Sequence, residues 1–296
     1  MTPVSSQESA AMQIAFGACS DTGHARENNE DSFALAPELS LFVLSDGMGG
    51  LAAGEVASKL ASETVIAHCL EAARNPSLPL IGEYLDLMSD NSNRLASAIR
   101  TANRAVYAAA QDNEKKRGMG ATVVAVWFVD EVRVSIAHVG DSRIYRLRDS
   151  DFVQLTEDHS FVAEQVRRGM MTRHEAENSN MQSVLLRALG VEPEVQVDVS
   201  EKDLLEGDTL LLCSDGLTRE LSNAQISATL REMEDPQEAA DRLIALANEA
   251  GGGDNITAVV VRYTPKPVGT FKRIGKWFKG SENRLLRSTR KRVRDD

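Results

Sequence analysis

The chain has 296 residues, of which 42% are hydrophobic and 26% charged, with a net charge of −11. This composition excludes a disordered or fibrous chain and fits one large globular domain with tails. The longest apolar run, about 121–129, is too short to span a bilayer, and the N-terminus lacks the basic and apolar blocks of a secretory signal. Three separated cysteines, Cys19, Cys69 and Cys213, form no CxxC pair, so we expect a reducing cytoplasm.

The charge is distributed unevenly along the chain. From Lys266 to Asp296 there are eleven Lys or Arg and three Asp or Glu, a net of +8, so the remaining residues carry a net of −19. An acidic body is atypical of nucleic-acid binders, and we expect no nucleic acid among the partners. Such a body could hold cations, although excess acid is often only a solubilising surface.

In the first half of the chain, residues 1–11 are polar and are predicted to be disordered. Short strands are predicted at 13–21, 31–38 and 39–45, separated by turn residues. Two helices should follow, an amphipathic, alanine-rich one over 54–72 and a longer one from about Tyr84 to Lys116.

In the second half, the predicted strands are grouped around a helical insert. Strands are expected at 121–129, 132–140, 143–149 and 152–156, before an insert of about 160–190. Strands return over 191–217, two amphipathic helices follow at 223–233 and 236–250, and a last strand covers 256–263. Because strands and helices are grouped without βαβ alternation, the class is α+β with antiparallel sheets, in a main domain of residues 12–264.

Acidic residues recur at the ends of the predicted strands. They are Glu30, Asp31, Asp46, Asp141, Asp215 and Asp254. One Asp-Gly pair alone is typical of a turn, but clustered carboxylates beside a core are unfavourable unless a cation compensates them. A site made only of oxygen atoms suits Mg²⁺ or Mn²⁺ and excludes a thiolate zinc site.

Five short motifs occur in one order along the chain. They are RENNED at 26–31, SDGMGG at 45–50, GDSR at 140–143, SDGL at 214–217 and GDN at 253–255. Together they resemble the metal-dependent protein serine/threonine phosphatases of the protein phosphatase 2C family, over about Ile14 to Tyr263. The DGMGG and LTEDHS segments are similar to the bacterial branch. The resemblance implies a four-layer α/β/β/α sandwich, with two antiparallel sheets flanked by helix pairs.

The resemblance also implies a set of metal ligands. Asp46 would bridge two ions, with the Gly47 carbonyl as a further ligand, and Asp215 and Asp254 would hold the first ion. Glu30 would serve the second ion, largely through water.

Three further roles follow from the same resemblance. Asp31 would orient a water on the metal, and Arg26 would bind the substrate phosphate. Asp141, together with Asp215, would form a third, weaker metal site. A guanidinium matches phosphate oxygens bidentately, which a lysine does not.

The implied function is hydrolysis of phosphoserine and phosphothreonine in proteins with Mn²⁺ or Mg²⁺. The enzyme would be a monomer that opposes a bacterial Ser/Thr kinase, and two cations would activate water and clamp the phosphoryl oxygens. One alternative is an inactive phosphoprotein-binding relative, which is disfavoured because Asp46, Asp215 and Asp254 are retained. The other is a hydrolase of small phosphoesters; no GxxxxGK[ST] loop supports it.

The chain departs from the family pattern in two places. Met48 stands where eukaryotic members have a histidine that acts as general acid, and a thioether cannot donate a proton. His24 is one substitute, although a turn histidine in solvent is the simpler interpretation, and His159 is expected to orient a loop. The insert resembles the family's mobile flap, but its Ser179–Ser183 stretch is unusual.

The C-terminal tail, residues 265–296, lies beyond the resemblance. Phe271, Ile274, Trp277 and Phe278 fall near one helical face among basic residues. Such a segment could bind an anionic membrane surface or an acidic partner, or it could be a solvated, disordered tail. The sequence leaves both open.

Overall fold

The structure is a computed structural model that describes residues 13–49, 53–112 and 114–264. The predictions for residues 1–11 and for the tail at 265–296 therefore lie outside the described residues. Among the described residues, no helix combines the length and the apolar character needed to span a membrane.

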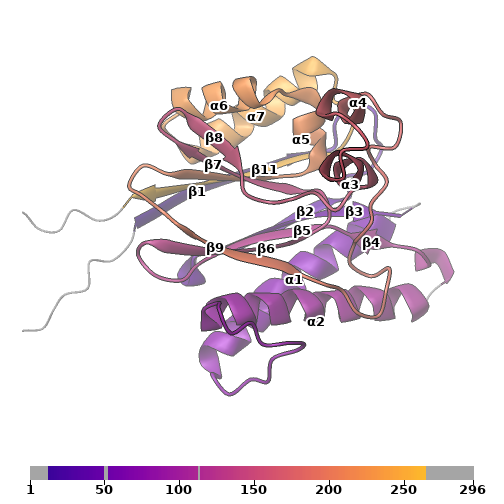
Figure 1. The fold of residues 1–296 in the computed structure, drawn as a ribbon, viewed down its shortest axis with the longest axis vertical. Coiled ribbons are helices and arrows are strands. Elements are labelled where there is room, and N and C mark those ends of the chain that lie inside the picture. The colour runs from indigo at the N-terminus through magenta and orange to yellow at the C-terminus, as the bar shows by residue number, and fades with distance from the viewer. Residues whose placement is uncertain (1–12, 50–52, 113, 265–296) are drawn as a thin grey trace, which may run out of the picture. The chain divides into compact units, whose positions relative to one another are not determined.

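Two antiparallel sheets form the centre of the molecule (Figure 1). The first sheet has the order β1 (Gln13–Asp21), β11 (Ile256–Thr264), β10 (Thr209–Cys213), β7 (Arg143–Arg148) and β8 (Asp151–Gln154). The second has the order β2 (Asp31–Ala36), β3 (Leu41–Met48), β5 (Val123–Phe128), β6 (Arg133–Val139) and β9 (Asp198–Asp203), and β4 (Gly120–Ala121) pairs with β3.

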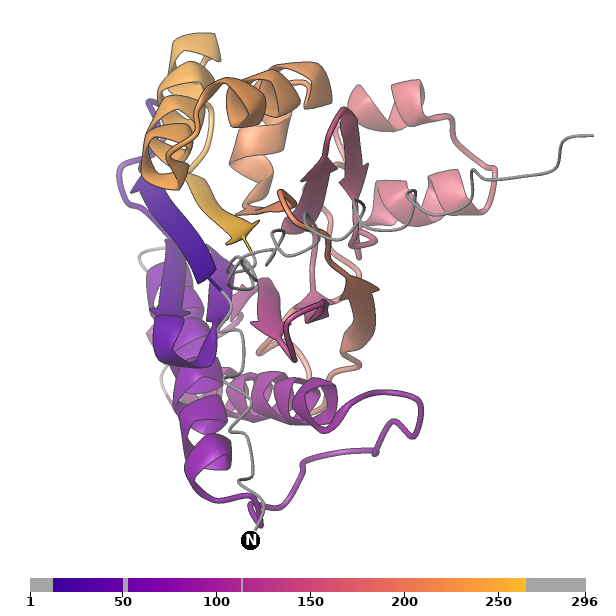
Figure 2. The same cartoon turned by 90° about the vertical axis from the view of Figure 1, so that its left-hand side faces the viewer.

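Helices cover the outer face of each sheet (Figures 1 and 2). Over the second sheet lie α1 (Ala53–Arg74) and α2 (Asp90–Asp112), and over the first lie α5 (Asp215–Glu220), α6 (Asn223–Glu232) and α7 (Pro236–Ala250). Short 3-10 turns occupy Pro37–Leu39 and Glu114–Lys116. The predicted α+β, four-layer sandwich is confirmed.

The central strands are apolar on both faces because both faces are buried. In β3, Leu41 and Val43 pack beneath α1 and α2, whereas Phe42 and Leu44 enter the core between the sheets. Such strands read as continuous apolar runs rather than alternating ones. This burial explains why an unbroken apolar segment leads into Asp46.

Strand β10 repeats this arrangement in the other sheet. Leu210 and Leu212 face the core between the sheets, whereas Leu211 and Cys213 pack against the layer of α5, α6 and α7. Burial raises the pKa of the Cys213 thiol to about 12. Cys213 is therefore a small core residue, as the sequence predicted, and not a nucleophile.

Helix α2 begins later than predicted, at Asp90 instead of about Tyr84. The Ser89 hydroxyl accepts from the Ser92 amide 3.2 Å away, which caps the helix at that point. The preceding loop is held in a non-helical path, since the Leu85 amide donates to Asn93 Oδ1 at 2.7 Å. Tertiary side-chain contacts thus override the local helical pattern.

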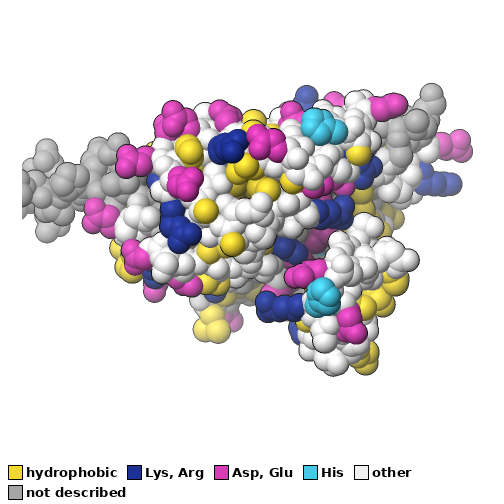
Figure 3. Space-filling view, turned by 90° about the horizontal axis from the view of Figure 1, so that it is seen from above, with side chains coloured by type: hydrophobic (Ala, Val, Ile, Leu, Met, Phe, Trp, Pro, Cys, Tyr) yellow, Lys and Arg dark blue, Asp and Glu magenta, His cyan; other side chains and the backbone are white. Residues whose placement is uncertain are grey.

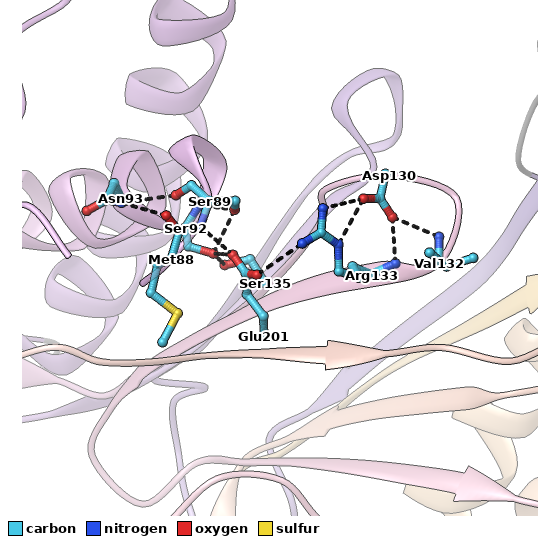
Figure 4. Close-up of polar contacts among 9 residues, drawn as sticks. All are labelled: Met88, Ser89, Ser92, Asn93, Asp130, Val132, Arg133, Ser135 and Glu201. Atoms are coloured by element: carbon cyan, nitrogen blue, oxygen red, sulfur yellow. Dashed lines mark hydrogen bonds and ion pairs between the residues drawn. The ribbon is translucent and has the colours of Figure 1, made fainter. Parts of the chain in front are cut away.

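A polar network fixes the start of α2 to the second sheet (Figure 4). Glu201 Oε1 accepts from the Ser89 amide at 2.7 Å and from the Ser92 hydroxyl at 2.6 Å. The Ser92 hydroxyl also lies 2.8 Å from that of Ser135. Arg133 lies 3.7 Å from Glu201 and completes the charge pairing.

The predicted insert, residues 160–190, forms a flap whose two short helices stand apart from the layers (Figure 2), whereas Leu189 near its end is buried against α1 and α2. It contains α3 (Phe161–Arg167) and α4 (Arg173–Glu177). Its base is closed by main-chain bonds from Phe161 to Val184 at 2.8 Å and from Leu186 to His159 at 2.7 Å.

The surface charges are mixed on the face seen in Figure 3. Lys and Arg side chains are interspersed there with Asp and Glu, with hydrophobic side chains scattered between them. The described Lys and Arg side chains do not form a single basic stripe across that face.

Candidate functional site

The predicted site residues converge on one cavity at the end of the two sheets. Its lining includes Arg26, Glu30, Asp46, Gly47, Met48, Thr122, Asp141, Ser183, Leu185, Asp215, Arg219, Asp254 and Asn255. All the acidic residues predicted as direct metal ligands line this cavity, although they come from distant parts of the chain. Asp31 lies next to them, because it is the partner of Asp46 in the β2–β3 register.

The end of β3 is held by Thr122, just before β5. Thr122 Oγ1 accepts from the Asp46 amide at 3.0 Å, and the Asp46 carbonyl accepts from the Thr122 amide at 2.8 Å. Gly47 cannot be replaced by a larger residue, since a Cβ there would lie 2.1 Å from the Gly54 carbonyl oxygen and 2.6 Å from that of Glu30. The strand is therefore closely packed where it delivers Asp46.

Asn255 joins two of the motifs. Its Oδ1 accepts from the Glu30 amide at 2.8 Å, and its amide nitrogen donates to the carbonyls of Thr22 and Asn28, both at 2.9 Å. These bonds fix the loop before β2 beside Asp254. Asn255 therefore helps to hold the first and last motifs together.

Asp31 is a buried acid with one oxygen satisfied. Its Oδ2 accepts from the hydroxyls of Ser214 at 2.8 Å and Thr257 at 2.6 Å. Its Oδ1 is buried and has no hydrogen-bond partner among the described residues. Burial, together with the nearby carboxylates of Asp215 and Asp254, raises the pKa of Asp31 to about 7 in spite of the two hydroxyl donors.

The other carboxylates also disfavour one another's charge. Burial and the neighbouring Asp31 and Asp215 hold the pKa of Asp46 well above its usual range. Burial, with Asp215 beside it, raises the pKa of Asp141 to about 7. Burial raises the pKa of Asp215 as well, although Arg219 opposes the shift. A crowded, oxygen-only set with an unsatisfied buried oxygen fits hard divalent cations such as Mn²⁺ or Mg²⁺.

Two arginines meet the cluster at Asp254. The Arg26 guanidinium binds this carboxylate in bidentate fashion, with contacts of 2.9 and 3.0 Å, and its side chain is 52% exposed. Arg219 lies 3.0 Å from Asp254 and also pairs with Asp215. The sequence prediction missed Arg219, although it lies four residues after Asp215, which places it on the same side of a helical turn.

Met48, which stands where eukaryotic members have a histidine, and His24, its possible substitute, differ in their place relative to this cavity. Met48 lines it, and its methyl group packs so closely on Gly120 that a Cβ there would lie 2.6 Å from Met48 Cε. His24 is exposed and is absent from the lining, and its amide donates to the Gly252 carbonyl at 2.7 Å. His24 is therefore a turn residue.

His159 supports the turn that carries Asp141. The Gly140 amide donates to His159 Nδ1 at 3.1 Å, and the His159 amide donates to the Gly140 carbonyl at 2.9 Å. His159 Nε2 lies 3.2 Å from Asp198, and His138 stacks on its ring with 4.7 Å between centroids. As predicted, His159 orients a loop.

His138, His159 and Asp198 form a separate group, outside the predicted site, whose ligand atoms lie close enough together to hold a metal ion. However, Arg187 Nη1 lies 2.6 Å from Asp198 Oδ1 and 3.2 Å from His159 Nε2. The guanidinium already supplies the positive charge at this place, so the group is a structural network that anchors the end of the flap.

An oxygen-donor cluster beside a half-exposed arginine, at the end of a two-sheet α/β/β/α sandwich, is typical of the metal-dependent phosphatases. The family model described as protein phosphatase 2C matches residues 22–248. The chain therefore belongs to the protein phosphatase 2C family of serine/threonine protein phosphatases.

Relatives of known function and structure agree with this membership. The serine/threonine phosphatase Stp of Listeria innocua is 37% identical over 244 residues, covering 81% of this chain and 92% of the relative. PstP of Mycobacterium tuberculosis is 38% identical, covering 83% of this chain and 44% of that longer relative. A crystal structure of the PstP catalytic domain, in complex with two manganese ions, has a TM-score of 0.71 at 38% identity and covers 86% of this chain and all of its own.

Proposed function

We propose that this protein hydrolyses phosphoserine and phosphothreonine in proteins, with Mn²⁺ or Mg²⁺ held by Glu30, Asp46, Asp215, Asp254 and the Gly47 carbonyl. The observation that carries the proposal is the convergence of these groups, from separate motifs, on one cavity. Burial chiefly raises the pKa values of Asp46 and Asp215, which supports a need for positive charge from bound ions. The related PstP structure holds two manganese ions, which agrees with a need for added positive charge.

Bound divalent ions would supply an acidified water and charge neutralisation for the phosphoryl oxygens. The protein's own groups do the positioning. Arg26 is half exposed at the rim, so its guanidinium can turn from Asp254 to a substrate phosphate and bind it bidentately. Asp31 can accept a hydrogen bond from a water through its unpartnered Oδ1, while Ser214 and Thr257 fix its orientation.

Asp141 is proposed to hold a third, weaker ion together with Asp215. Both line the cavity, and the Asp215 charge is among the causes of the raised pKa of Asp141. Arg219 pairs with Asp215 and lowers the pKa of Asp141, so a further cation would meet a guanidinium already in place. This competition would give a third ion a lower affinity.

The assay is phosphate release from phosphothreonine peptides by the chelator-treated protein, with and without Mn²⁺. Release with Mn²⁺ and none with excess chelator supports the proposal. Binding of phosphopeptides without release would favour the inactive relative. Cleavage of a small aryl phosphate but of no phosphopeptide would favour the small-phosphoester hydrolase.

The biological setting is part of the same proposal. We propose a cytoplasmic, monomeric enzyme that opposes a bacterial Ser/Thr kinase and binds no nucleic acid, with a basic tail able to contact a membrane surface or an acidic partner. The bacterial serine/threonine phosphatases among its relatives support phosphoproteins as the substrates. Phosphoproteomics of a deletion strain would identify the substrates, and no change in phosphoserine or phosphothreonine sites would contradict it.

A further inference from the structure

A second hollow adjoins the active-site cavity on the side of the flap. It is lined by Ser179, Asn180, Gln182, Ser183 and Arg219. Ser183 and Arg219 also line the active-site cavity, so the two hollows share a wall. A substrate segment that places its phosphate in the first hollow therefore carries a neighbouring residue into the second.

We propose that Arg219 and the flap tip form a subsite for an anionic group, a carboxylate or a second phosphate, next to the phosphorylated residue. This inference rests on the proposed phosphatase function. It assigns a role to Arg219 and to the unusual Ser179–Ser183 stretch.

The chemistry of the second hollow favours an anion. Arg219 is the one charged residue in its lining, and the other four side chains are hydroxyls and amides that can donate hydrogen bonds. A guanidinium flanked by neutral donors matches a carboxylate or a phosphate, and no acid in this lining repels one.

Arg219 is held at a fixed place but keeps capacity for a ligand. Its helix, α5, is anchored by Leu217 and Leu221 in the core, and Gly216 packs against the Asn255 carbonyl. The ion pairs of Arg219 use Nη1 and Nη2, and its side chain is 33% exposed. Both partners, Asp215 and Asp254, are proposed metal ligands, so ion binding would draw their charge away from the guanidinium.

Arg26 and Arg219 would then have separate tasks. Both reach Asp254, but Arg219 alone of the two extends along the second hollow. Arg26 is thus placed for the phosphate that reacts, and Arg219 for a charge beside it. If Arg219 instead bound the reacting phosphate, its loss would affect all substrates equally.

The test compares phosphothreonine peptides that differ only in one flanking residue, which is Glu, Gln or phosphoserine, placed on either side. The Mn²⁺-loaded full-length protein should have a kcat/KM about 5-fold higher for a peptide with an acidic neighbour than for the Gln peptide. This is the size expected for a partly exposed ion pair. The difference should lie in KM and not in kcat. In Arg219→Ala the ratio should fall to near one, and Arg219→Lys should restore part of it. Raising the salt concentration should reduce the wild-type ratio.

Arg242→Ala is the matched control, because Arg242 is an exposed arginine on α7 that pairs with Glu249 at 3.2 Å. It should keep the wild-type ratio. Preference for Glu identifies a carboxylate as sufficient, and preference for phosphoserine alone identifies a second phosphate as the ligand.

Equal kcat/KM for acidic and neutral peptides in the wild type would overturn the subsite, as would an unchanged ratio in Arg219→Ala. A uniform fall in kcat for every peptide would also overturn it. Fluorescence anisotropy with the same peptides measures the binding ratio without turnover. A wild type that releases no phosphate would therefore contradict the proposed function, while the binding ratio still decides the subsite.

Discussion

The molecule contains two clusters of buried or half-buried acids that differ in how their charge is satisfied. Around Glu201, two serines donate hydrogen bonds and Arg133 supplies a positive charge (Figure 4). Burial of Glu201 would raise its pKa, but the bonds from Ser89 and Ser92 outweigh it and hold the pKa below the usual range. Around Asp46 the outcome is opposite, since burial and other carboxylates raise the pKa.

The difference separates a structural role from a functional one. A carboxylate that is paired with hydrogen-bond donors and a cation has a lower pKa in the folded protein than in the unfolded chain. Its ionisation therefore stabilises the fold. A crowded, unsatisfied set destabilises the folded protein until a cation or a proton arrives, and such sets are typical of functional sites. Changes in the two clusters should therefore have opposite effects on stability and activity.

The largest effect is expected from Asp215→Asn. Phosphate release with Mn²⁺ should fall by more than about 100-fold, because changes to groups around metal ligands already cost up to this amount. The metal-free variant should melt no lower than the wild type, since one repelling charge is removed. Phosphate release and thermal melts followed by circular dichroism measure the two effects, and undiminished release would contradict the metal assignment.

Glu201→Ala should show the reverse pattern. The variant should lose about 1–3 kcal/mol of unfolding free energy, because the Ser89 amide and the buried Ser92 hydroxyl at the start of α2 lose their acceptor. Its Mn²⁺-dependent activity at 25 °C should stay close to that of the wild type. Urea titration gives the stability. A variant that is as stable as the wild type but inactive would contradict the distinction between the clusters.

A smaller effect is expected in the pH dependence of the metal-free protein. Asp31 and Asp141 have pKa values of about 7 in the folded protein, above those of the unfolded chain. At pH values between the unfolded and the folded pKa, the folded protein therefore binds more protons than the unfolded chain. The free energy of unfolding falls as the pH rises through about 7. Burial lowers the pKa of His138, which acts in the opposite sense, but the carboxyls are more numerous.

The measurement is a series of melting temperatures from pH 5 to pH 8 in chelator. The metal-free wild type should melt lower at pH 8 than at pH 5, and Asp31→Asn should reduce this difference. Saturating Mn²⁺ should remove it, because the ions take the place of the protons. A melting temperature that rises steadily with pH in chelator would contradict the account.

The smallest effect is expected from deleting residues 266–296. Peptide hydrolysis with Mn²⁺ should remain within a factor of about two, because all proposed site residues precede the deletion. Co-sedimentation with anionic vesicles, for the full chain and the deletion, measures membrane contact separately. Loss of peptide hydrolysis would mean that the tail belongs to the catalytic domain.

Much of the fold and site could be predicted from local sequence. Strands β3 and β10 were predicted because continuous apolar runs end on Ser-Asp-Gly, and the structure shows both faces of each buried. Asp46 and Asp215 were recognised through five motifs in register with a known family. The convergence of their carboxylates on one cavity agrees with that resemblance.

The remainder depends on contacts between distant residues. The start of α2 was placed too early because Asn93 holds Leu85 in a loop, a contact that helical periodicity does not reveal. Asn255 accepts a hydrogen bond from the Glu30 amide, and Thr122 accepts one from the Asp46 amide. An asparagine or a threonine in the sequence does not by itself indicate such a long-range bond. Arg219 joins the site through its ion pairs with Asp215 and Asp254, and its place beside the flap tip depends on the tertiary fold.

The most direct test of the central claim is titration of Mn²⁺ into chelator-treated wild type and Asp46→Asn by calorimetry, with phosphate release measured at each step. The account predicts at least two ions bound per wild-type chain, with activity rising as they bind. Asp46→Asn should lose this binding and the activity together. Equal binding by both proteins, or phosphate release before any ion is bound, would contradict it.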